Sequence, residues 1–131
     1  MYRVLVPVDR SVERAKEQIE YVTSLPGAPD GIDVQVLFVN KADYAGAKER
    51  TFEDVESATM VRDALTDAGI SCEGKMREGM IARNILSEAE EFDADEIVMA
   101  GRDRSGTMKV LLGSVTQDII LSSERPVVVV G

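Results

Sequence analysis

The sequence predicts a doubly wound α/β fold in which five parallel strands, in the spatial order 3-2-1-4-5, carry helices on both faces. Two observations point to this class. Short apolar runs rich in β-branched residues alternate with longer segments in which apolar residues recur every third or fourth position. The alternation continues along the chain without a linker or an internal repeat. It implies parallel strands joined by right-handed crossovers, and residues 1–131 are therefore expected to form a single domain.

The first part of the chain is expected to form a strand, a helix and a second strand. Residues 2–8 (YRVLVPV) are apolar and too few for a core helix, which indicates a buried strand. Ser11 follows as the expected cap of a helix with one apolar stripe. That helix should end before Pro26, because proline cannot continue it. The second strand is expected at residues 32–40 (IDVQVLFVN).

The rest of the chain continues the alternation. Apolar residues at helical spacing predict a long amphipathic helix over residues 52–68, closed by Gly69 in the position that a C-cap prefers. Polar residues alternate along residues 70–77, as expected of an edge strand or a half-exposed one. A third helix should cover residues 81–92, with the acidic run that begins at Glu88 on its exposed face. The remaining elements are a strand at 95–100, a helix with Ser114 as its N-cap, and an apolar strand within 125–131, which together complete a Rossmann-like order.

Composition excludes several classes of function. The formal net charge of −9 repels nucleic acid and anionic membranes, so neither is expected as a partner. Histidine is absent, which removes the commonest general base and metal ligand at neutral pH. Cys72 is the single cysteine and cannot form an internal disulfide, and the N-terminus carries no signal-peptide core. A cytoplasmic protein without a bound metal is expected.

Two segments are the candidate ligand site. In a doubly wound sheet, ligands bind outside the carboxyl ends of the strands where the winding direction reverses. Here these positions follow the first and fourth strands. The two segments are Asp9-Arg10-Ser11 and residues 101–114. The candidate binding residues in and beside them also include Pro7, Val8, Ala100, Val115 and Thr116.

The second segment has the chemistry of an anion site. Gly113 lets backbone approach a ligand without an intervening Cβ, and the N–H groups of Val115 and Thr116 lie at a helix N-terminus that carries about half a positive charge. The hydroxyl groups of Ser114 and Thr116 add donors. The loop between Gly101 and Gly113 also carries cations in an otherwise acidic protein, namely Arg102, Arg104 and Lys109. It is not a P-loop, since Thr107 and Met108 stand where lysine and serine would be required.

The chain resembles the universal stress protein family over nearly its whole length. The resemblance rests on VLVPVDRS, on LFVN, on Gly101 with Gly113-Ser114-Val115-Thr116, and on the ending RPVVVV. It implies that Asp9 meets the adenosine end of a nucleotide, that Val39 presents its backbone to the adenine, and that the glycines and hydroxyls hold ribose and phosphates. Two positions depart from the family pattern: Arg104 replaces the second loop glycine and Arg10 replaces the glycine after Asp9.

The resemblance implies a stress-response regulatory protein that binds ATP, with or without Mg²⁺, and is at most a weak ATPase. One alternative is a family dimer that does not bind nucleotide and acts as an interaction module. Another is an enzyme of the wider adenine-nucleotide α-hydrolase or nucleotidyltransferase group, although the chain lacks the histidine of one signature and the SGGxDS loop of the other. The last strand is expected at the sheet edge, where it would pair with a second copy to form a homodimer.

Overall fold

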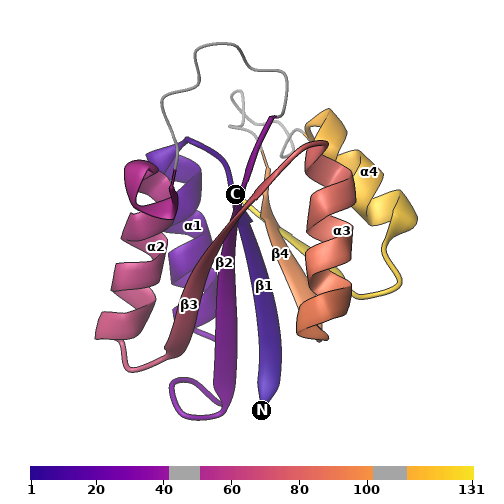
Figure 1. Ribbon diagram of the computed structural model, residues 1–131. Coiled ribbons are helices and arrows are strands. Elements are labelled where there is room, and N and C mark those ends of the chain that lie inside the picture. Colours follow the sequence, from indigo (N-terminus) through magenta and orange to yellow (C-terminus); the bar gives the residue numbers. More distant parts are fainter. Residues whose placement is uncertain (42–50, 102–111) are drawn as a thin grey trace, which may run out of the picture.

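The computed structural model describes residues 1–41, 51–101 and 112–131, which form a sheet of parallel strands in the order β3-β2-β1-β4-β5 (Figure 1). The predicted fold class and strand order are confirmed. In chain order the elements are β1 (Tyr2–Val8), α1 (Val12–Thr23), β2 (Ile32–Asn40), the 3₁₀ helix η1 (Phe52–Asp54), α2 (Glu56–Asp67), β3 (Ser71–Glu78), α3 (Ile81–Phe92), β4 (Glu96–Ala100), α4 (Ser114–Ser122) and β5 (Val127–Val130).

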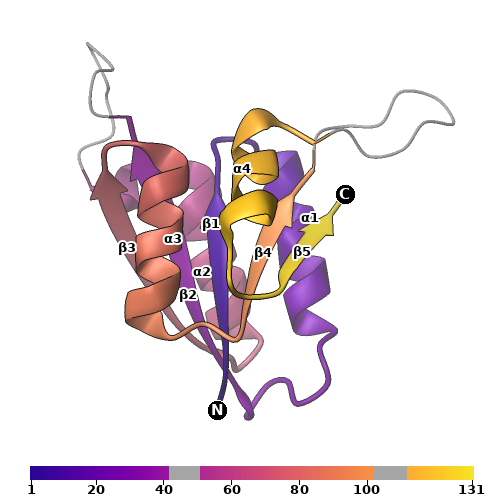
Figure 2. The same ribbon diagram turned by 90° about the vertical axis from the view of Figure 1, so that its right-hand side faces the viewer.

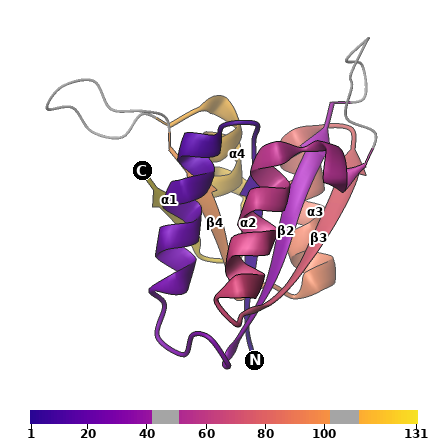
Figure 3. The ribbon, with the colours of Figure 1, turned by 90° about the vertical axis from the view of Figure 1, so that its left-hand side faces the viewer.

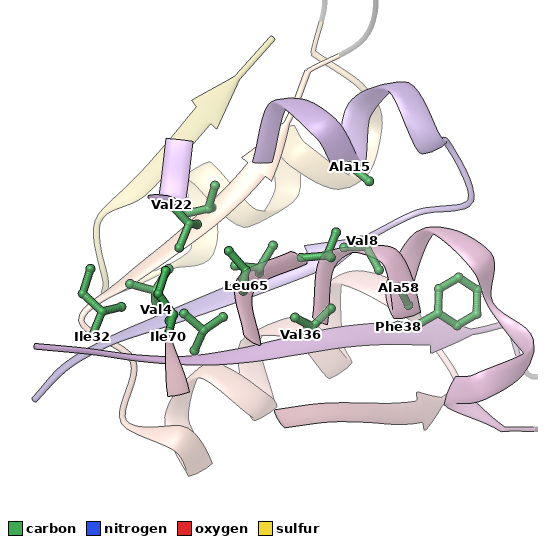
Figure 4. Packing of buried hydrophobic residues seen from close by; sticks show 14 of the residues in the cluster. Val4, Val8, Ala15, Val22, Ile32, Val36, Phe38, Ala58, Leu65 and Ile70 are labelled. Atoms are coloured by element: carbon green, nitrogen blue, oxygen red, sulfur yellow. The ribbon is translucent and has the colours of Figure 1, made fainter. Parts of the chain in front are cut away.

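Two hydrophobic clusters hold the helices on opposite faces of the sheet. Successive side chains of a strand point to opposite faces, so Val4 and Val36 face α1 and α2 while Leu5 and Leu37 face α3 and α4. Figure 3 shows α1 and α2 together over one face. In Figure 4, Val22 and other α1 and α2 side chains meet the strand residues of the first cluster. None of the described helices has the length and apolar composition needed to cross a bilayer.

The sheet divides where β1 and β4 separate. The β1–β2 ladder continues to Val8↔Phe38 and the β4–β5 ladder to Ala100↔Val130, but the β1–β4 ladder ends at Leu5↔Ile97. The carboxyl-terminal ends of β1 and β4 are therefore not paired with each other, although each remains paired with its other neighbour. This is the topological switch point of the fold.

The predicted helix over residues 52–68 is wrong at its start. Residues 52–54 form a separate 3₁₀ turn, and α2 begins only at Glu56. The Asp54 carboxylate accepts the Thr51 N–H at 3.0 Å, which closes a capping box within this short turn. The Phe52 ring lies over Gly74, where a Cβ would come within 2.5 Å of it. The aromatic contact with β3 thus draws the turn away from the axis of α2.

The expectation that the acidic run of α3 is exposed is also wrong for Glu88, which is only 2% exposed. Its carboxylate pairs with Lys75 Nζ at 3.0 Å and Arg77 Nη1 at 2.9 Å. It also accepts a hydrogen bond from Gln35 Nε2 at 2.6 Å. Because α3 covers the polar face of the edge strand β3, an acid on its inner side neutralises cations that the strand presents there.

Candidate functional site

A cavity of about 290 Å³ opens where β1 and β4 part. Its wall is built from the carboxyl ends of β1, β2 and β4, from α1 and α3, and from the first turn of α4. Figure 2 shows α4 beginning beside the end of β4. The lining includes the predicted site residues Pro7, Val8, Asp9, Val39, Ala100, Gly113, Ser114, Val115 and Thr116.

Among the predicted residues that the structure describes, Gly101 alone does not line the cavity. Gly101 is buried, and its N–H donates to the Val130 carbonyl at 2.7 Å, so it continues the β4–β5 pairing behind the wall. Arg102 and Arg104, like Lys109, lie outside the described residues.

Hydrogen bonds on both sides fix Asp9 at the cavity rim. Its Oδ1 accepts the Ser11 N–H at 2.8 Å, and its Oδ2 accepts Arg14 Nε at 2.7 Å. The main-chain carbonyl of Asp9 accepts the Ser57 hydroxyl of α2. Each carboxylate oxygen keeps a further lone pair, so an oriented Asp9 can still accept a hydrogen bond from a ligand. Asp9 therefore combines the structural role of a turn residue with the geometry of a binding residue.

The N-terminus of α4 differs from the prediction by one residue. Gly113 is the N-cap and Ser114 the first helical residue, because the first intrahelical bond runs from the Gln117 N–H to the Gly113 carbonyl at 3.0 Å. Gly113 has no side chain that could cap the helix, and the first-turn N–H groups have no acceptor within the helix. The backbone of Gly113 (φ −72°, ψ 167°) is one that any residue adopts. Gly113 therefore provides no cap of its own for the positively polarised helix end in the cavity wall, although its backbone conformation would allow a capping residue at this position.

Sequence reasoning missed the polar residues that α1 contributes. Arg14 and Gln18 line the cavity from this helix, and Arg10 lies over the Phe38 ring at 5.0 Å from its centroid. Of the two α1 residues, only Gln18 gave a signal. It falls between Ala15 and Val22 on the buried stripe of α1, where an amide is unexpected. Arg10 follows Asp9 in a segment that the switch-point rule indicates, whereas no pattern places Arg14 at a cavity.

The cavity combines an apolar interior with a polar rim. Leu37, Ile81, Ile85 and Met99 supply the apolar part, and the ionisable groups of the described lining are one carboxylate and two guanidinium groups. Such a lining suits a ligand with a flat apolar part and an anionic part. Over the described ranges, no cluster of acidic or thiol side chains could hold a metal ion. Cys72 lies elsewhere, and burial raises the pKa of its thiol to about 12, which makes it a poor nucleophile.

Comparison with known proteins gives one consistent result. The sequence model of the universal stress protein family matches residues 1–131. A universal stress protein of Methanocaldococcus jannaschii is 35% identical over 78 residues, which cover 60% of this chain and 46% of that protein, so the match spans about half of the relative's length. A universal stress protein structure from Archaeoglobus fulgidus has a TM-score of 0.75 at 25% identity, covering 100% of this chain and 99% of that one. A structure from the same organism in complex with dAMP has a TM-score of 0.69 at 23% identity, with coverage of 100% and 98%.

Proposed function

The chain belongs to the universal stress protein family, and from that premise we propose that it is a stress-response regulatory protein that binds an adenine nucleotide in the cavity between β1 and β4. The observation that carries the proposal is the N-terminus of α4, which begins in the cavity wall at Gly113, an N-cap residue without a side-chain acceptor. First-turn N–H groups, which have no acceptor inside the helix, and the positive end of the helix dipole together form a site for phosphate. The A. fulgidus structure bound to dAMP is a family relative that supports this ligand class.

The ends of the cavity suit the two ends of a nucleotide. Asp9 directly follows β1 and Val39 lies on β2, where they would meet the adenosine, and the first turn of α4 would hold the phosphates. The cavity volume is close to the lower end of the range for ligand pockets, about 300–1,000 Å³. Its described cations, Arg10 and Arg14, lower the repulsion between an anionic ligand and a protein of net charge −9.

ATP is the proposed ligand, with any Mg²⁺ bound through its phosphate oxygens. Hydrolysis is expected to be slow at most. In the described lining, the only carboxylate that could take a proton from an attacking water is that of Asp9, and both of its oxygens already accept hydrogen bonds, from the Ser11 N–H and from Arg14. The proposed role is therefore nucleotide sensing.

Isothermal titration calorimetry with ATP, ADP, AMP and GTP tests the proposal, at several salt concentrations and with and without Mg²⁺. The expected result is a dissociation constant below about 1 mM for an adenine nucleotide and weaker binding of GTP. A value above 1 mM for all three adenine nucleotides would reject the proposal. It would favour the alternative in which the protein is an interaction module without a nucleotide.

A homodimer through β5 is the proposed assembly. β5 lies at the edge of the sheet. Pro126, just before β5, and Val130 direct their carbonyl groups to β4 and the residue after it. Residues 127 and 129 therefore direct their backbone groups to the open edge, where a second copy could pair. Light scattering at micromolar concentration should give the mass of a dimer, and Val129→Pro, which removes one edge donor, should lower it toward that of a monomer. A monomeric mass for the unaltered protein would refute this assembly.

A further inference from the structure

Pro7 interrupts the hydrogen bonding of a central strand. β1 lies between β2 and β4, a position that ordinarily excludes proline. The register pairs Leu5 with Ile97, so residue 7 would pair with residue 99 if the ladder continued. Ile97 directs its N–H to β5, so Val98 directs its backbone groups to β1. In that parallel ladder the N–H of residue 7 would donate to the Val98 carbonyl, and the N–H of residue 100 to the Pro7 carbonyl.

One side chain replaces both of these missing rungs. Gln18 of α1 is 2% exposed, and its Nε2 donates to the Pro7 carbonyl at 2.7 Å and to the Val98 carbonyl at 3.0 Å. These are the two carbonyl groups whose ladder donors are lost, the first because the strands part and the second because proline has no N–H. Gln18 thus satisfies two buried acceptors with one amide, and it does so from between the strands.

The position of this amide links it to the cavity. Gln18 lines the cavity together with Pro7. The ladder between β1 and β4 ends at the pair Leu5↔Ile97, so it stops before Pro7. If β1 and β4 paired through residues 7 and 100, their carboxyl ends would approach to the spacing of neighbouring strands, about 4.8 Å. We propose that Gln18 is a positioning residue for the ligand cavity, which holds β1 and β4 apart by taking over the hydrogen bonds that would otherwise close the sheet. Its effect on nucleotide affinity rests on the proposed function.

Two variants separate this role from a purely structural one. Gln18→Met keeps the side-chain length but removes the donor, and should lower the melting temperature by several degrees and weaken ATP binding at least tenfold in protein that is still folded by circular dichroism. Pro7→Ala/Gln18→Met restores a backbone N–H at residue 7, which can reach the Val98 carbonyl once the amide is gone. The double variant should recover most of the lost melting temperature but not the affinity.

Gln35→Met is the matched control. This substitution also removes a side-chain hydrogen bond, the one that Gln35 donates to Glu88, but Gln35 does not line the cavity. It should lower the melting temperature and leave ATP affinity within twofold of the unaltered protein.

The outcomes decide the inference in each case. The inference is overturned if folded Gln18→Met, or the double variant, binds ATP as tightly as the unaltered protein. A double variant that fails to fold would also overturn it. If the unaltered protein binds no nucleotide, the proposed function fails and hydrogen exchange decides the positioning role separately. Newly slow amides at residues 7 and 100 of the double variant, relative to the unaltered protein, would then support strand closure, and unchanged exchange at residue 100 would refute it.

Discussion

Replacing Gly113 by aspartate should stabilise the protein and weaken its affinity for nucleotide. Gly113 is the N-cap of α4 and provides no side-chain acceptor for the first-turn N–H groups. An aspartate at this position would accept from those groups and place a negative charge at the positive end of the helix. The same N–H groups are the ones that a phosphate would use. Capping and ligand binding therefore compete for one set of donors.

The magnitudes follow from the two effects. Aspartate in place of glycine at an N-cap gains a few tenths of a kcal/mol, and the charge at the helix end adds about 0.3–1 kcal/mol. The sum, about 0.5–1.5 kcal/mol, corresponds to a rise in melting temperature of about 2–5 °C for a domain of this size. Loss of charge-assisted hydrogen bonds, about 1.5–3 kcal/mol each, would weaken phosphate binding by at least about tenfold.

Thermal melts with and without ATP measure both effects in one experiment. Gly113→Asn offers a similar cap without the charge and should also raise stability and weaken binding, though by less. Gly113→Ala adds a Cβ without a cap and should lower stability, because alanine is a poorer N-cap than glycine. A Gly113→Asp protein that is stabilised by ATP as strongly as the unaltered one would refute the reasoning about the site. One that is less stable without ligand would refute the reasoning about the cap.

Three further predictions concern other parts of the fold. Gly74→Ala should lower the free energy of unfolding by about 1–3 kcal/mol in urea, because the new Cβ would lie 2.5 Å from the Phe52 ring; an unchanged midpoint would show that the ring moves freely. Glu88→Gln should cost about 2 kcal/mol by the same measurement, since it removes a buried charge from two partly exposed cations. Burial and the neighbouring Glu96 carboxylate raise the pKa of Tyr21 to about 12. Tyr21 therefore stabilises the fold fully below pH 10, and this stabilisation is lost as the pH rises to 12. Tyr21→Phe should flatten the alkaline decline in melting temperature.

The central strands were predictable because a buried strand is a short run of apolar residues that can be recognised from the local sequence. β1 and β2 coincide with their predicted ranges, 2–8 and 32–40, since each is an apolar run with clear limits. The start of α2 was not predictable in the same way. Phe52 and Val55 have helical spacing, but Phe52 packs on Gly74 of β3, a contact between distant segments. The spacing of apolar residues indicates which side chains are buried, but it does not indicate which neighbouring element they pack against.

The candidate site was predictable to the extent that topology determines it. The switch-point rule predicts that Asp9 and Gly113 lie at the same end of the sheet, and both line the cavity there. The contributions of Arg14 and Gln18 depend on how far β1 and β4 separate, and this distance is not encoded in any local pattern. For the same reason Glu88 was expected on the surface. Its partners on β3 are brought to it only by the packing of α3.

Three residues at the cavity contradict local rules of stability. Pro7 forfeits a donor in a central strand, Gln18 places an amide on a buried helical stripe, and Gly113 gives α4 no cap from its own side chain. Local inconsistencies of this kind are expected where function opposes packing. Pro7 and Gln18 compensate each other, which keeps the sheet open without leaving carbonyl groups unpaired. Gly113 has no such partner within the described structure, and a bound phosphate would supply the acceptor that its helix lacks.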